Sequence, residues 1–216
     1  LLCEELIPAV AGEQLARFCD IFIEEGAFTP AEAKKVLGKA QEVGLGLKIH
    51  ADQLSNGGGA SLAAKLDAVS AEHLEYIDEV GIKALAKSDT VAVSLPLASL
   101  YLRERYLPAR AMLEAGVRVA VATDFNPGSA PSYHLPLAMT LACINQQMTP
   151  QEVLMGATTV AARAVAEEQH IGSLLPGYAA DIAIIDAPTL NHWLYHFRGN
   201  ACIGVIKNGE WARQSF

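Results

Sequence analysis

The sequence predicts an α/β fold in which a parallel sheet with crossover helices is followed by a smaller β element. Short apolar segments alternate five times with helix-like segments up to residue 123, and short connections join them. Of the 216 residues, 51 % are hydrophobic, which is enough to build a sizeable core. The pattern changes to short strands near the C-terminus. We therefore expect one unit over residues 1–170 and a second over residues 171–216.

The five expected strands are short segments rich in β-branched and small residues. The last of them, VRVAVAT, carries such residues on both faces, as strands buried on both sides of a parallel sheet do. The expected strands cover residues 19–23, 45–51, 68–74, 90–95 and 117–123. Two shorter strands are expected at 181–186 and 203–207, and the Asn208-Gly209 pair after the second predicts a hairpin.

Helix-start signals lie between and after the strands. In the stretch TPAE at residues 29–32, the threonine can cap a helix, the proline suits its first position, and the glutamate can bond back to the cap. The stretch TPQE at residues 149–152 repeats the signal, and Asp78 predicts another cap. The expected helices cover residues 29–43, 60–66, 78–86, 108–115, 135–145, 149–157 and 158–166.

Composition excludes several classes of partner. The net charge is −8 and the isoelectric point is near 5.2, the opposite of a phosphate-binding surface, so we expect no nucleic-acid partner. We also expect no membrane span, because no segment reaches about 18 continuous apolar residues. The four cysteines are far apart and form no CxxC pair, which predicts reduced thiols in a cytoplasmic protein.

Three polar side chains occupy equivalent places at the ends of the expected strands. His50 ends the second strand, His73 the third, and Asp124 the fifth. The carboxyl ends of parallel strands share one face of a sheet or barrel, where active sites are built. Each residue alone also fits a structural role, since a histidine can be a satisfied packing residue and an aspartate can cap a turn. Their coincidence favours a shared metal or acid–base site, because imidazole and carboxylate suit zinc or iron.

Two loops lie beside this face. Asn126, Gly128 and Ser129 follow Asp124 in a turn that cannot continue the strand, and His134 beyond them could line a pocket on the same side. The three glycines at 57–59 lack the spacing of a phosphate-binding loop, so we expect a flexible loop beside His50.

The stretches KIHADQLSNGGG, SAEHLEYIDEVGIKALA, MLEAGVRVAVATDFNPGSAP and GSLLPGYAADIAIID resemble the imidazolonepropionases of the amidohydrolase superfamily. The resemblance covers nearly the whole chain and is most specific at the DFNPG loop. It implies a TIM barrel with a small β-sandwich built from both chain ends. It also implies hydrolysis of the cyclic C–N bond of 4-imidazolone-5-propanoate, giving N-formimino-L-glutamate in histidine degradation.

The resemblance further implies roles for individual residues. One divalent ion, zinc or iron, would be held in part by His50 and Asp124, and Asp124 would also move a proton. His73 would assist the chemistry without binding the metal. The substrate would contact Asn126, Gly128 and Ser129, together with Gln53. The family often has glutamate at that last position, and a neutral amide can bind the ring but cannot exchange a proton near neutral pH.

The sequence departs from the family in one respect, because it contains no His-x-His metal-binding pair. The five strands would then be strands four to eight of the barrel, and the chain a C-terminal portion of a homodimeric enzyme that acts on a small molecule. Two other interpretations stay open. One is another cyclic amidohydrolase or deaminase of the superfamily. The other is a barrel fragment that only binds a ligand or partner.

Overall fold

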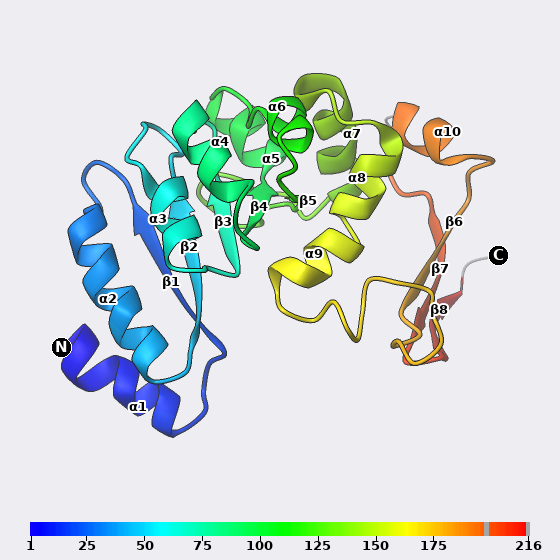
Figure 1. Cartoon of the computed structure of the whole chain (residues 1–216). Coiled ribbons are helices and arrows are strands. Elements are labelled where there is room, and N and C mark those ends of the chain that lie inside the picture. The colour runs from blue at the N-terminus through cyan, green and yellow to red at the C-terminus, as the bar shows by residue number, and fades with distance from the viewer. Residues whose placement is uncertain (197–198, 215–216) are drawn as a thin grey trace.

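A five-stranded parallel sheet forms the centre of the computed structural model, which describes residues 1–196 and 199–214 (Figure 1). Its strands pair in chain order, each with the next. They are β1 (Phe18–Ile23), β2 (Gly46–Ala51), β3 (Ser70–His73), β4 (Val91–Ser94) and β5 (Val119–Val121). All four pairings are parallel, so the predicted strands and sheet type are confirmed.

Helices connect consecutive strands and cover the outer face of the sheet (Figure 1). They are α2 (Pro30–Glu42), α3 (Gly59–Lys65), α4 (Glu79–Leu85), α5 (Pro96–Leu102) and α6 (Ala109–Glu114). The capping box predicted at the start of α2 is present, and Asp78 caps α4 through the Gly81 N–H. Helix α5 was not predicted, and its N-cap Leu95 offers no side-chain hydrogen bond.

The two faces of the sheet differ in polarity where the first strands lie. In β2, Leu47, Ile49 and Ala51 are buried in the core, whereas the alternate residues Lys48 and His50 are only half-buried. The same alternation in β1 buries Ile21 and Ile23. Side chains on successive strand residues point to opposite faces, so the polar residues of β1 and β2 share the face away from the helices.

After β5 the chain forms three helices, as predicted: α7 (Leu135–Gln146), α8 (Pro150–Gly156) and α9 (Thr159–Ala164). A separate antiparallel sheet follows, with the order β6 (Ile182–Ile185), β7 (Cys202–Lys207) and β8 (Glu210–Gln214). Asn208 and Gly209 both have positive φ and form the predicted hairpin turn. The boundary expected near residue 171 falls between α9 and β6.

Three further helices were not predicted. The short π-helix η1 (Leu2–Leu6) and α1 (Ile7–Gly12) begin the chain, and α10 (Leu190–Tyr195) packs on α7 and α8. The N-terminal helices and the three-stranded sheet lie at opposite ends of the molecule (Figure 1). Among the described residues, the helices are all too short or too polar to cross a bilayer.

Candidate active site at the strand ends

Backbone strain marks the carboxyl ends of three strands. Asp52 follows β2, His73 and Leu74 lie at the end of β3, and Asp124 follows β5, and all four have φ between +50° and +76°. Residues other than glycine rarely adopt this left-handed backbone conformation, and each instance costs on the order of 1 kcal/mol or more. Such strain is concentrated at functional sites. Its recurrence at three strand ends supports a site on this face.

His50 is oriented by a carboxylate from the neighbouring strand. Its Nδ1 lies 3.0 Å and 2.8 Å from the two carboxylate oxygens of Asp20 on β1. Burial lowers the pKa of His50, but the hydrogen bond and charge of Asp20, together with the charges of Glu72 and Asp124, raise it above its ordinary value overall. A carboxylate at Nδ1 keeps the proton on that nitrogen and leaves the Nε2 lone pair for a metal.

Glu72 on β3 extends this cluster on the other side of His50. Its Oε2 lies 4.0 Å from His50 Nδ1 and has no hydrogen-bond partner among the described residues, although it is buried. The other oxygen, Oε1, forms an ion pair of 2.9 Å with Lys48 and accepts a hydrogen bond from Ser70. One ligand atom from each of Asp20, His50 and Glu72 lies within 4.8 Å of the others. Nitrogen and carboxylate donors at this spacing suit a divalent metal.

The turn after β5 is organised around Asp124. The Asn126 side-chain amide donates to the Asp124 backbone oxygen at 2.7 Å and to its Oδ2 at 3.2 Å, and the Ser129 hydroxyl donates to the same Oδ2 at 3.3 Å. The Asn126 Oδ1 accepts the N–H groups of Gly128 and Ser129, each at 2.8 Å. The residues expected to bind substrate thus first hold each other and fix the direction of the Asp124 carboxylate.

His73 lies beside His50. The centroids of the two imidazole rings are 5.5 Å apart, and their planes are tilted by 55°. The His73 side chain is only 5 % exposed, whereas that of His50 is 30 % exposed. The structure therefore brings together the histidines that end β2 and β3, and the Asp124 charge acts on His50 from the end of β5.

Gln53 lies half-buried in the connection between β2 and α3, which is fixed from β1. The Glu24 carboxylate, just after β1, accepts the N–H of Leu54 at 2.9 Å and that of Ser55 at 3.3 Å, and also the Ser55 hydroxyl. Burial raises the pKa of Glu24, but these hydrogen bonds outweigh it and hold the pKa below its ordinary value. The loop that carries Gln53 is thus anchored by an ionised carboxylate.

The glycines at 57–59 are held as well. The Asp52 carboxylate accepts the N–H of Gly57 at 2.9 Å, of Gly59 at 3.2 Å and of Ala60 at 3.0 Å. A Cβ at Gly59 would lie 2.3 Å from the Ala51 Cβ, so the helix start packs too closely on β2 for a side chain. Three hydrogen bonds thus fix the segment expected to be flexible, and a carboxylate already uses N–H groups that a phosphate would need.

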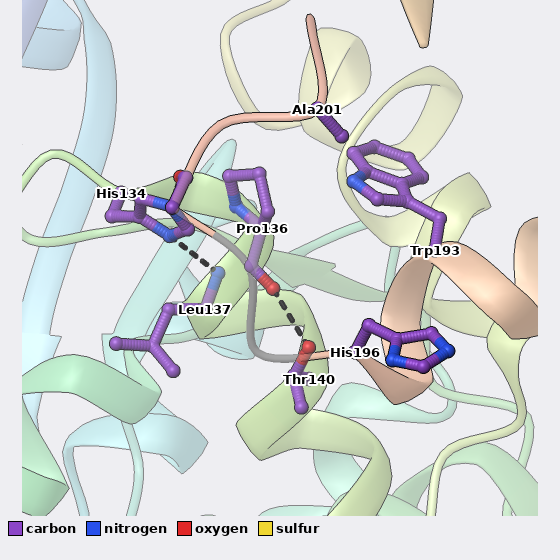
Figure 2. A pocket seen from close by; sticks show the side chains of 8 residues that line it. His134, Pro136, Leu137, Thr140, Trp193, His196 and Ala201 are labelled. Carbon is purple, nitrogen blue, oxygen red and sulfur yellow. Dashed lines mark hydrogen bonds between the residues drawn. The ribbon is translucent and has the colours of Figure 1, made fainter. Parts of the chain in front are cut away.

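His134 lines a different cavity. Its Nδ1 accepts the Leu137 N–H at 3.0 Å and caps α7, and its Nε2 contacts the Gly199 carbonyl. With Trp193 and His196 it borders a cavity of about 230 Å³ between α7, α10 and the chain before β7 (Figure 2). Neither His50, His73 nor Asp124 lines this cavity.

Sequence reasoning missed the carboxylates that support the two histidines. Asp20 stands between apolar residues in CDIFI, and Glu72 precedes His73 in SAEH. A charged residue inside an apolar strand indicates a side chain directed at another polar group, so the signal was present. Which group each carboxylate faces depends on strand register.

The chain matches known proteins over nearly its whole length. Residues 22–212 match the model of the amidohydrolase family. An imidazolonepropionase from Fusobacterium nucleatum subsp. nucleatum is 46 % identical over 95 % of this chain, and one from Shouchella clausii is 46 % identical over 97 %. These alignments cover 50 % and 47 % of the two relatives. The chain thus spans about half the length of the curated relatives it matches.

Solved structures share the fold at low sequence identity. A zinc-bound adenosine deaminase from Xanthomonas campestris superposes with a TM-score of 0.79 at 21 % identity, over 96 % of this chain and 56 % of that one. A 5-methylcytosine deaminase from Klebsiella pneumoniae superposes with a TM-score of 0.82 at 17 % identity, over 99 % and 59 %. The parallel sheet, the strand-end cluster and the family match lead to one conclusion: the chain belongs to the amidohydrolase family, whose members depend on a metal, and resembles the imidazolonepropionases within it.

Proposed function

We propose that this chain is the C-terminal portion of an imidazolonepropionase, which hydrolyses 4-imidazolone-5-propanoate to N-formimino-L-glutamate. In this proposal β1 to β5 are strands four to eight of a TIM barrel, and β6 to β8 are part of a small β-sandwich. The alignments over half of each relative support this assignment. The observation that carries the function is the placement of His50, His73 and Asp124 at strand ends, with Asp20 orienting His50.

His50 and Asp124 would hold the metal, through the Nε2 that Asp20 leaves available and through a carboxylate oxygen. These donors fit one zinc or iron ion, although two ligands alone do not complete a stable shell. When bound, such an ion supplies Lewis-acid chemistry, lowering the pKa of water from about 15.7 to about 7. The unpartnered Glu72 Oε2 adds negative potential beside His50, which also favours a cation.

The residues of this chain move the protons of the reaction. Asp124 accepts a proton from the attacking water as its oxygen bonds to the ring carbonyl carbon. When the C–N bond breaks, Asp124 returns that proton to the departing ring nitrogen. His73 orients the water or stabilises the negative charge that develops on the carbonyl oxygen. The hydrogen bonds from Asn126 and Ser129 keep the Asp124 carboxylate directed for both transfers.

Substrate binding falls to the two fixed loops. Gln53 would hydrogen-bond the imidazolone ring through its neutral amide. The turn containing Asn126, Gly128 and Ser129 would receive the polar groups of the substrate. Gly128 brings no side chain, which lets the ligand approach the backbone closely. The expectation that the enzyme is a cytoplasmic homodimer remains a prediction.

The direct test uses the full-length protein that contains this chain, loaded with zinc or with iron. We expect it to consume 4-imidazolone-5-propanoate and to release N-formimino-L-glutamate, and His50→Ala to abolish this activity together with metal binding. His170→Ala, at an exposed histidine, is the matched control and should behave as wild type. A metal-loaded protein inactive on this substrate but active on another cyclic amide or an aminopyrimidine would support a different amidohydrolase instead. Inactivity on all of them, with a ligand still bound, would support the binding role.

A further inference from the structure

Glu75 is a buried carboxylate that the proposed mechanism does not use. The residue is only 3 % exposed. Its Oε1 accepts a hydrogen bond of 2.9 Å from the Ser99 hydroxyl on α5, and its Oε2 is buried without a hydrogen-bond partner among the described residues. Removing a carboxylate from water is costly unless another group compensates it. One neutral hydroxyl is poor compensation, so this side chain requires an explanation.

The missing partner is His73. The Glu75 Oε1 lies 3.6 Å from His73 Nδ1, and this nitrogen is also buried without a hydrogen bond among the described residues. The unpartnered ring nitrogen thus lies just beyond hydrogen-bond distance of a carboxylate whose nearer oxygen accepts only the Ser99 hydroxyl and whose other oxygen has no partner among the described residues. In the part of the chain that the structure describes, no lysine or arginine forms an ion pair with Glu75.

The strained end of β3 holds this pair in place. His73 and Leu74 both have positive φ, and the Leu74 side chain is fully buried in the core. Leu74 is anchored further because its N–H donates to the Ala51 carbonyl at 3.1 Å. The strained backbone at His73 and Leu74 therefore sets where His73 and Glu75, on the two sides of Leu74, are placed. Strain of this kind persists only where the surrounding structure enforces it.

We propose that Glu75 is a positioning residue for His73, and this inference rests on the catalytic role proposed for that histidine. The carboxylate accepts the Nδ1–H of His73 and keeps the proton on that nitrogen. The Nε2 of His73 then carries the lone pair and is the atom available to the reacting groups. A lone pair on Nε2 suits His73 to orient the water, because it can accept a hydrogen bond from the attacking water. It does not suit His73 to stabilise the negative charge on the carbonyl oxygen, which would need a donor. Ser99 holds the carboxylate in position.

The arrangement parallels the carboxylate that orients histidine in serine proteases, where replacing it by the amide lowers kcat by about 10⁴ through the wrong tautomer. Glu75→Gln keeps the shape and the Ser99 contact but can present an NH₂ group to His73 Nδ1. In the full-length, metal-loaded protein we expect kcat to fall by about 10²- to 10⁴-fold, with KM nearly unchanged and the metal retained. Glu79→Gln, on the exposed face of α4, is the matched control.

A second readout does not depend on activity. ¹⁵N spectra of the histidine side chains, with His73 assigned from His73→Gln, report which ring nitrogen carries the proton. We expect Nδ1–H in the wild-type holoenzyme and a shift towards Nε2–H in Glu75→Gln. Glu75→Asp, which keeps the charge, should recover part of kcat. These outcomes together would support the positioning role.

Other outcomes would overturn it. Wild-type kcat in Glu75→Gln, with only thermal stability altered, would make Glu75 a structural link between β3 and α5. An Nε2–H tautomer in the wild-type protein would refute the inference even if the variants failed to fold. A protein inactive on 4-imidazolone-5-propanoate would refute the proposed substrate and leave the tautomer measurement as the test of Glu75.

Discussion

Asp20 shows how a carboxylate within a strand can determine which nitrogen of a neighbouring histidine is free to bind a metal. Its contact with His50 Nδ1 leaves Nε2 as the ligand atom. In Asp20→Asn the amide can donate to Nδ1 and favour the opposite tautomer. We expect metal affinity in the full-length protein to fall about 10- to 100-fold, measured by competition with a chelator. Asp67→Asn, at an exposed turn, is the matched control, and equal affinities in the two variants would contradict the role of Asp20.

His73 is expected to take part in catalysis without binding the metal, although it lies on the same face as His50. It adjoins His50 but is expected to act on the reacting groups. His73→Ala in the full-length enzyme should therefore lower kcat by about 10²- to 10³-fold while the metal content stays near that of wild type. Metal analysis of the purified variant checks the second half of this prediction. Loss of the ion from His73→Ala would make this histidine a ligand.

The Asn126 side-chain amide forms hydrogen bonds within its own turn and with Asp124. Removing this side chain should therefore affect both the turn and Asp124. We expect Asn126→Ala to lower kcat/KM by an amount equivalent to about 1–3 kcal/mol, because Asp124 loses a donor and the turn loses its acceptor. Steady-state kinetics on 4-imidazolone-5-propanoate measure this loss. Wild-type kinetics combined with lower thermal stability would show that the turn is only structural.

Among the helices, the contact between α6 and α8 shows how the start of a helix can contribute to stability. Glu152 closes the capping box of α8 with Thr149 and binds Arg110 of α6 at 2.9 Å and 3.1 Å. The hydrogen bond to the Arg110 guanidinium lowers the pKa of Glu152, and the Thr149 hydrogen bonds lower it further. Burial raises this pKa, but the net result is a value of about 2. A depressed pKa means that the interaction stabilises the fold above the unfolded value of 4.5 and is lost as pH falls towards 2.

Replacing Glu152 by glutamine should therefore cost stability only while the carboxylate is ionised. We expect the variant to lower the free energy of unfolding by about 1 kcal/mol at neutral pH, the usual size of a cap contribution. The difference from wild type should shrink once the pH falls below 4.5. Urea unfolding of both proteins at several pH values measures it. Glu114→Gln, which also pairs with Arg110 but caps no helix, is the control.

Two helices could be predicted from sequence because of the signals at their starts. Both capping boxes were found because threonine, proline and glutamate stand at fixed spacing, and α2 and α8 begin there. Helix α5 was not predicted, because Leu95 at its start has no capping side chain and its apolar run resembles a continuing strand. α10 was also missed, although Thr189 caps it, because Leu190 and His192 stand where α2 and α8 have proline and glutamate.

Some residues of the candidate site can be recognised from the local sequence pattern, whereas others depend on the register between strands. His50, His73 and Asp124 could be proposed as site residues because each ends or follows an apolar strand, a feature visible along the chain. The carboxylates around His50 could not be proposed, because they lie on the neighbouring strands β1 and β3. In the observed register His50 pairs with Glu72, whereas Asp20 pairs with Lys48 and reaches His50 diagonally. One sequence does not fix register between parallel strands joined by helices.

At the scale of the whole molecule, β1 has an exposed face and lies at the edge of the sheet. The proposed barrel would therefore need further strands to cover it. Asp20 and Phe22 of β1 are exposed on the face away from the helices, where the barrel interior is proposed, and Phe22 is 37 % exposed. The edge of β1 that does not face β2 pairs with no further strand among the described residues, apart from an isolated bridge between Ile23 and Phe28. Apolar side chains and strand edges of this kind are normally covered by further strands.

The proposed metal site should depend on the part of the relatives' length that this chain does not cover. His50 and Asp124 supply two donors, whereas protein-bound zinc normally has three or four protein ligands. We expect the full-length protein to retain about one equivalent of zinc or iron through gel filtration. The 216-residue segment alone should retain far less under the same conditions, with circular dichroism confirming that it has folded. Adding the separately expressed N-terminal half should restore retention, because its strands would bring the remaining ligands. Stoichiometric retention by the folded segment alone would mean that Asp20, His50, Glu72 and Asp124 form a complete site by themselves.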